Sequence, residues 1–175
     1  MKLIIQGSKV VGTATDEYTG PEQFITAPAD FDITRMADYV FASGVVTVTP
    51  SGLDWTKAQQ IALLTAACAA AITAGFTSSA LGSAYTYPSQ MTDQANLSAN
   101  VLSSLLPGLP TAWTTMQLCQ DPSGVWSYVN HTAAQIQQVG TDGKAAILSA
   151  LVKKNSLVEQ VNAASTAAAV EAIVW

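Results

Sequence analysis

Charged residues are scarce in this chain of 175 residues. Asp, Glu, Lys and Arg together make up only 11% of it, whereas an ordinary soluble domain contains about 25%. Twelve acidic residues outnumber seven basic ones, and the net charge is −5. Because binding to a phosphate backbone needs clustered Lys and Arg, nucleic acid is excluded as a main partner. With so little charge and 49% hydrophobic residues, we expect exposed apolar area on the monomer, which favours self-association or a large assembly.

Long apolar runs are also missing. The longest, from Ile61 to Phe76, is interrupted by Thr65 and Thr73 and is shorter than the roughly 20 residues that a membrane-spanning helix needs. We therefore expect a buried helix and no membrane insertion. The apolar start, residues 1–5, is too short for a signal peptide, and no small-residue cleavage site follows it. Synthesis in a cytoplasm is the expected consequence.

The residues that usually carry chemistry are few. Cys68 and Cys119 have no metal-type spacing around them and are predicted to be buried free thiols. Any Ser-His-Asp or Cys-His mechanism must use His131, the single histidine, but it directly precedes an expected helix cap, where we predict a structural role. Glycine-rich phosphate loops and G-x-S-x-G are absent. The sequence predicts no enzyme, no metal and no cofactor; a glycosidase built from distant carboxylates is the weaker alternative.

The fold is predicted to be α+β, with a small N-terminal β-hairpin unit (residues 1–50) followed by an α+β domain (residues 51–175). In the first part, Gly7-Ser8 and the connection 42–44 each suit a hairpin loop. The flanking strands are expected at residues 3–6, 9–15, 39–41 and 45–48. Residues 18–28 contain glycine and two prolines, so we expect a loop lying over the sheet.

The second part is predicted to alternate helices and hairpins. Its elements are expected to be a helix from a cap at Asp54 or Thr56 to Ala74, a hairpin at 76–79 and 84–87, a helix at 90–106, and a hairpin at 113–119 and 125–130. The two hairpins are expected to share a short antiparallel sheet. Trp126 and Tyr128 alternate along a strand and so lie on one face, which we place in the core.

A long C-terminal helix should follow. The capping box of Thr132 and Gln135 opens it, and apolar residues recur at helical intervals as far as Val161. Gly140 and Gly143 each cost about 1 kcal/mol relative to alanine in a helix, so a break or kink is expected near them. After a last short helix, the apolar chain end supplies the candidate protein-contact residues, Ile173, Val174 and Trp175. The alternative is that the stripe packs on its own domain and Trp175 closes the same core.

Several stretches carry a resemblance to a known family. They are AAITAGFTSSALG at 70–82, TYPSQMTDQANL at 86–97, GVWSYVNHTAAQIQQV at 124–139 and VNAASTAAAVEAIVW at 161–175. Together, from about residue 55 onward, they resemble a bacteriophage tail-associated domain family of uncharacterised biochemistry. The start, MKLIIQGSKVVGTATDEYTGP, is similar to the front part of small phage tail proteins associated with fibres.

The resemblance implies a role in a phage tail and brings no catalytic residues with it. We expect a structural component of the virion tail, at the fibre, baseplate or tail tip, made in the cytoplasm of the bacterial host. Its partners would be tail fibre or baseplate proteins and further copies of itself. Because fibres are commonly trimeric, we favour a threefold homo-oligomer. The alternative is a tail fibre assembly chaperone that is not retained in the virion.

Overall fold

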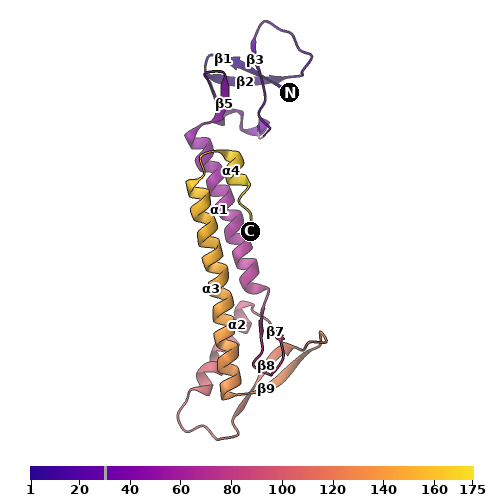
Figure 1. The fold of residues 1–175 in the computed structure, drawn as a ribbon, viewed down its shortest axis with the longest axis vertical. Coiled ribbons are helices and arrows are strands. Elements are labelled where there is room, and N and C mark those ends of the chain that lie inside the picture. The colour runs from indigo at the N-terminus through magenta and orange to yellow at the C-terminus, as the bar shows by residue number, and fades with distance from the viewer. Residues whose placement is uncertain (30) are drawn as a thin grey trace. The chain divides into compact units, whose positions relative to one another are not determined.

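The computed structural model describes residues 1–29 and 31–175, and it confirms the α+β fold class (Figure 1). A hairpin-built N-terminal sheet comes first, and an α+β part with a short antiparallel sheet and a long C-terminal helix follows, as predicted. Contacts divide the chain into two compact units. Unit 1 comprises residues 1–64 and 156–175, and unit 2 comprises residues 65–155.

Unit 1 begins with a five-stranded antiparallel sheet in the order β3-β1-β2-β4-β5. Its strands are β1 (Lys2–Gln6), β2 (Lys9–Ala14), β3 (Gln23–Thr26), β4 (Tyr39–Ala42) and β5 (Val45–Val48). Both predicted hairpins are confirmed. The expectation of an irregular loop over residues 18–28 was wrong, because β3 forms there and pairs with β1. Its four residues fit between Pro21 and Pro28, and an edge strand tolerates nearby proline.

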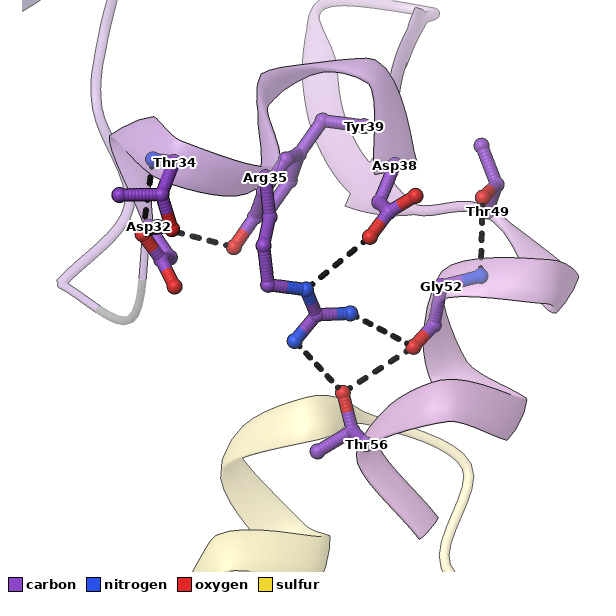
Figure 2. A network of polar contacts seen from close by, with 8 residues as sticks. All are labelled: Asp32, Thr34, Arg35, Asp38, Tyr39, Thr49, Gly52 and Thr56. Atoms are coloured by element: carbon purple, nitrogen blue, oxygen red, sulfur yellow. Dashed lines mark hydrogen bonds and ion pairs between the residues drawn. The ribbon is translucent and has the colours of Figure 1, made fainter. Parts of the chain in front are cut away.

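An arginine joins this sheet region to the first helix (Figure 2). Arg35 belongs to the 3-10 helix η1 (Ile33–Asp38), which the sequence reading missed. Its guanidinium donates to the Asp38 carboxylate at 3.0 Å, to the Gly52 carbonyl at 2.8 Å and to the Thr56 hydroxyl at 3.0 Å. It also lies over the Trp55 ring, 4.0 Å from the centroid. One side chain thus connects η1 with the first turns of α1.

Helix α1 spans Pro50–Thr73, so the expected cap at Asp54 or Thr56 was wrong. The helix begins at Pro50, and proline is favoured in the first helical turn because its missing N–H is not needed there. Thr56 lies inside the helix and donates its hydroxyl to the Gly52 carbonyl one turn earlier, at 3.1 Å. The expected end is nearly right, because Gly75 follows with a φ of 103°.

The helical part of unit 1 has its own core. The end of α3 (Ala133–Ala163) and the short α4 (Ala167–Glu171) pack with α1 there. Its fully buried members are Leu64, Val161 and Val170. Thr166 caps α4 by accepting a hydrogen bond from the Ala169 N–H at 3.2 Å. A separate cluster of Leu3, Ile5, Val10, Tyr39 and Val46 holds the five-stranded sheet.

Unit 2 contains the second sheet, in the order β6-β7-β8-β9. Its elements are β6 (Phe76–Ser78), β7 (Tyr85–Tyr87), α2 (Met91–Ser104), β8 (Thr114–Gln120) and β9 (Trp126–Thr132), with parts of α1 and α3. The expectation that the two hairpins share one sheet is confirmed. Its core is formed by Phe76, Tyr87, Leu97, Cys119, Ile136 and Val139.

Helix α3 starts as predicted and continues without the expected break. The Thr132 hydroxyl accepts from the Gln135 N–H at 3.3 Å, and the Gln135 side chain accepts from the Thr132 N–H at 2.9 Å, which completes the capping box. The helix then runs unbroken through both glycines. A Cβ at Gly140 would lie 2.7 Å from Val101 of α2, and one at Gly143 would lie 2.8 Å from the Phe76 ring. The glycines therefore permit close packing instead of marking a kink.

Candidate protein-contact surfaces

The hairpin of β8 and β9 is closed by an aspartate. The Asp121 carboxylate accepts hydrogen bonds from the Ser123 hydroxyl at 2.6 Å and from the Val125 N–H at 3.0 Å, and the Ser123 hydroxyl bond is the main reason for its lowered pKa. Gly124, with a φ of 90°, donates its N–H to the Asp121 carbonyl at 3.0 Å. This is a three-residue loop with glycine in the left-handed position. It fixes the register in which Gln120 opposes Trp126.

That register gives the hairpin one covered face and one open face. Successive side chains of a strand point to opposite sides. Gln117, Cys119 and His131 are buried on the covered side. The opposite side carries Met116, Leu118, Trp126 and Tyr128, which we call the hairpin face. Met116, Trp126 and Tyr128 are exposed there and Leu118 is half-buried.

The prediction that Trp126 and Tyr128 lie in the core was wrong. Trp126 is 47% exposed and Tyr128 is 69% exposed. The alternation was correct, so the two residues do share a face, but it is the face that lies opposite the buried Cys119 and His131. Ser127, Val129 and His131 share the other face of β9, on which Val129 is half-buried and His131 is buried. The signal that could have indicated this phase is His131, since the strand has to bury its histidine or its tyrosine.

The covered face holds a buried polar cluster. His131 Nδ1 lies 2.9 Å from the Val129 carbonyl and Nε2 lies 2.8 Å from the Tyr87 hydroxyl. Because a carbonyl can only accept, Nδ1 carries the proton and Nε2 accepts from Tyr87. Burial lowers the pKa of His131 and raises the pKa of the nearby Cys119 thiol. A neutral imidazole with both nitrogens bonded, beside a protonated thiol, holds the strand-to-helix corner in place and is poorly suited to nucleophilic chemistry.

A second apolar surface lies between α2 and α3. It is a groove of about 720 Å³, with Lys144 among its polar lining residues. Its apolar lining includes Phe76, Leu97, Val101, Leu102, Leu105 and Ile147. Leu102 and Leu105 are largely exposed. The sequence analysis did not predict this groove.

The predicted contact residues at the chain end are not equivalent in the structure. Ile173 and Trp175 pack against the cluster of Leu64, Val161 and Val170 in unit 1. The Ile173 carbonyl also accepts a hydrogen bond from the Gln60 side chain at 2.6 Å. Val174 points away and is 67% exposed. Of the three residues, Val174 is the one whose side chain is largely available to another molecule.

Charge is distributed very unevenly between the two units. Unit 2 contains three acidic residues and three lysines, so the whole net charge of −5 belongs to unit 1. The six charged residues of unit 2 are Asp93, Asp121, Asp142, Lys144, Lys153 and Lys154. The hairpin face therefore belongs to a unit that is neutral and almost uncharged.

Residues 1–29 and 31–175 contain no group of three or more His, Cys, Asp or Glu side chains placed to hold a metal ion. Within the same part of the chain, no helix combines the length and the apolar character that crossing a membrane requires.

The architecture is thus that of an α+β protein with two antiparallel sheets, of five and of four strands, and a long C-terminal helix. Residues 55–174 match the family described as a domain of unknown function, DUF4376, and the chain belongs to this family. The match includes the hairpin face, the groove and all of unit 2. No curated protein and no solved structure matches the chain.

Proposed function

We propose that this protein is a structural component of a bacteriophage tail, at the fibre, baseplate or tail tip, and that it acts through protein–protein contacts. It is made in the cytoplasm of the bacterial host and works in the virion tail. Its partners are tail fibre or baseplate proteins and further copies of itself, without nucleic acid and without insertion into a membrane. The tail setting rests on the resemblance of the sequence stretches quoted above.

The contact role rests on one observation, the exposed hairpin face of unit 2. Tyr, Trp and Met are enriched in the centres of protein interfaces, and charged residues are depleted there. The hairpin face has this composition, with Trp126, Tyr128 and Met116 exposed on two paired strands. Asp121, in the turn, is the only charged residue between positions 94 and 141. A hollow that Met116, Leu118 and Tyr128 line also contains Asp93 of α2, so a partner that covers this face meets one carboxylate at its border.

Protein mass spectrometry on purified phage particles tests the tail setting. A structural component is expected in stoichiometric amount with the fibre or baseplate proteins. If the protein is absent from particles but fibres fail to assemble without its gene, it is an assembly chaperone and the proposal of a virion part is wrong. If particles lacking the gene are normal in composition and infectivity, the tail setting itself is wrong.

A charge placed on the hairpin face tests the contact role. Leu118→Lys puts an ammonium among Met116, Trp126 and Tyr128, so binding to the tail partner is expected to fall at least tenfold. Val45→Lys is the matched control, because Val45 is also an exposed strand residue but lies in unit 1. Equal loss of binding in both variants, or in neither, would contradict a role for the hairpin face.

A further inference from the structure

Strand β9 forms an open edge of the second sheet. It is the last strand in the order β6-β7-β8-β9, and no other described strand pairs with its outer side. An edge of this kind presents unpaired backbone N–H and C=O groups, which another strand can satisfy. The edge is a surface of main-chain donors and acceptors, so its natural occupant is an extended strand.

The register shows which backbone groups face outward. In an antiparallel ladder, hydrogen-bonded and non-hydrogen-bonded pairs alternate. The Asp121 N–H donates to the Val125 carbonyl at 3.0 Å, so the next opposed pair, which includes Trp126, is of the non-hydrogen-bonded kind. The Met116 carbonyl agrees with this phase, because it points away from β9 and accepts from Asn100 at 3.2 Å. The backbone groups of Trp126, Tyr128 and Asn130 therefore face the open edge.

The usual devices that protect an edge strand are absent from β9. Natural edges carry lysine, proline or a β-bulge, or are very short. The seven residues of β9, WSYVNHT, contain no proline and no Asp, Glu, Lys or Arg. The ladder to β8 runs in continuous register over all seven residues, without a bulge. This edge is seven residues long, without a bulge and without a charged side chain.

We propose that β9 pairs with β9 of a second copy of this chain, antiparallel and across a twofold axis at Tyr128. This register puts Tyr128 opposite its own copy and Trp126 opposite Asn130, so every outward backbone group of the three residues meets a complementary group. The two sheets become one sheet of twice as many strands. The inference rests on the self-association within the proposed function but not on the tail setting, and it gives a twofold contact instead of a threefold one.

The distribution of charge favours a second copy over a charged partner. Unit 2 has no net charge, so two units approach without the repulsion that two copies of the acidic unit 1 would meet. In the antiparallel register the two Asp121 turns lie at opposite ends of the paired strands. The open apolar surface around Trp126 and Tyr128 becomes continuous across the axis, with cross-strand contacts between the two copies.

A matched pair of substitutions tests the backbone pairing in the full-length protein. Asn130→Pro removes one outward N–H and leaves the β8 ladder intact, whereas Asn130→Thr keeps that N–H in a residue suited to strands. Light scattering coupled to size exclusion is expected to show a dimer for the natural protein and for Asn130→Thr. Asn130→Pro should weaken dimerisation at least tenfold with an unchanged circular dichroism spectrum. If it does not fold, Tyr128→Lys, which opposes two like charges at the axis, serves instead.

Cysteine cross-linking tests the register. Opposed residues of a hydrogen-bonded pair have Cα atoms about 5.5 Å apart, within the range that a disulfide spans. Tyr128→Cys is therefore expected to give a disulfide-linked dimer under mild oxidation. Trp126→Cys should not, because its own copy lies about four residues further along the strand, roughly 13 Å away.

The outcomes separate the possibilities. A monomer at all concentrations overturns the proposal, as does an oligomer that Asn130→Pro and Tyr128→Lys leave unchanged. A dimer in which Trp126→Cys cross-links and Tyr128→Cys does not overturns the register. A monomer that still binds a tail protein, and loses that binding in Asn130→Pro, shows that another protein's strand occupies the edge. In that case self-pairing fails while the proposed tail function stands.

Discussion

Different interactions stabilise the two units of this protein. Unit 1 carries the whole net charge, and the guanidinium of Arg35 in this unit donates hydrogen bonds to Asp38, Gly52 and Thr56. Unit 2 has six charged residues with no net charge and depends on close packing, with Phe76 against Gly143 and Val101 against Gly140. A neutral unit with an open apolar face can associate without repulsion, while an acidic unit keeps the chain hydrated. This contrast supports the proposal that unit 2 makes the protein–protein contacts.

The largest expected effect is in the packed core of unit 2. Tyr87 is fully buried, stacks on Phe76 with ring centroids 5.5 Å apart and bonds to His131. Tyr87→Ala should lower the free energy of unfolding by about 4 kcal/mol, measured by chemical denaturation. Tyr87→Phe keeps the ring but leaves His131 Nε2 without its partner, so a smaller loss is expected. A Tyr87→Ala protein as stable as the natural one would contradict the packing described for unit 2.

Unit 1 should become less stable when the Arg35 guanidinium is removed. Arg35→Ala removes three hydrogen bonds and the contact with Trp55, and we expect the free energy of unfolding to fall by about 2 kcal/mol. Arg35→Lys keeps the charge but not the planar fork of donors, so most of the loss should remain. If Arg35→Lys is as stable as the natural protein, the positive charge alone provides the stabilisation and the hydrogen bonds of the guanidinium do not.

Much of this fold could be predicted from the sequence, and the misses share a physical cause. Local signals were sufficient for the Gly7-Ser8 hairpin, the Thr132 capping box and the sheet shared by the two hairpins. What failed depended on distant partners. Shifting the alternation of β9 by one residue exchanges its buried and exposed faces. Packing against distant elements, which the local sequence does not reveal, buries the face with His131 and leaves the face with Trp126 exposed.

Surface features were also predicted only in part. The low charge content correctly predicted exposed apolar area, but not its position. The low helix propensity of Gly140 and Gly143 predicted a kink, whereas the close approach of Val101 and Phe76 explains why glycine occupies these positions in an unbroken helix. Arg35 stands in no recognisable motif, and nothing in the sequence alone connects it with Gly52 and Thr56.

Gly143 of α3 offers a test in which the sign of the change in stability matters. In an ordinary helix, Gly143→Ala should stabilise by about 1 kcal/mol. Here the new Cβ would lie 2.8 Å from the Phe76 ring, and overpacking costs about 1–3 kcal/mol, so we expect a net loss of about 1 kcal/mol in thermal or chemical denaturation. In a Phe76→Leu background the same change should become stabilising. A gain in stability in the natural background would show that unit 2 is more loosely packed than described.

A pH effect should be confined to unit 2, because His131 is the only histidine. Burial lowers the pKa of His131, and the bond to the Val129 carbonyl opposes this shift. The unfolded chain therefore binds a proton more readily than the folded one. The stabilisation is complete above the ordinary histidine pKa of about 6.5 and is lost as pH falls below it. Denaturation between pH 7.5 and 5.5 should show this decline in the natural protein and not in His131→Gln.

The smallest expected effect on stability is at Trp126, and it distinguishes a contact residue from a core residue. Trp126 is 47% exposed on the hairpin face, so Trp126→Ala should change the free energy of unfolding by less than about 0.5 kcal/mol. A buried tryptophan would cost about 3–5 kcal/mol. The same variant should weaken self-association, which light scattering over a concentration series measures, because its ring contributes to the surface continued across the paired β9 strands. Val45→Ala, an exposed strand position in unit 1, is the control and should change neither quantity. A large loss of stability with intact association would show that Trp126 is a core residue. It would also contradict the proposal that unit 2 makes the contacts while unit 1 carries the charge.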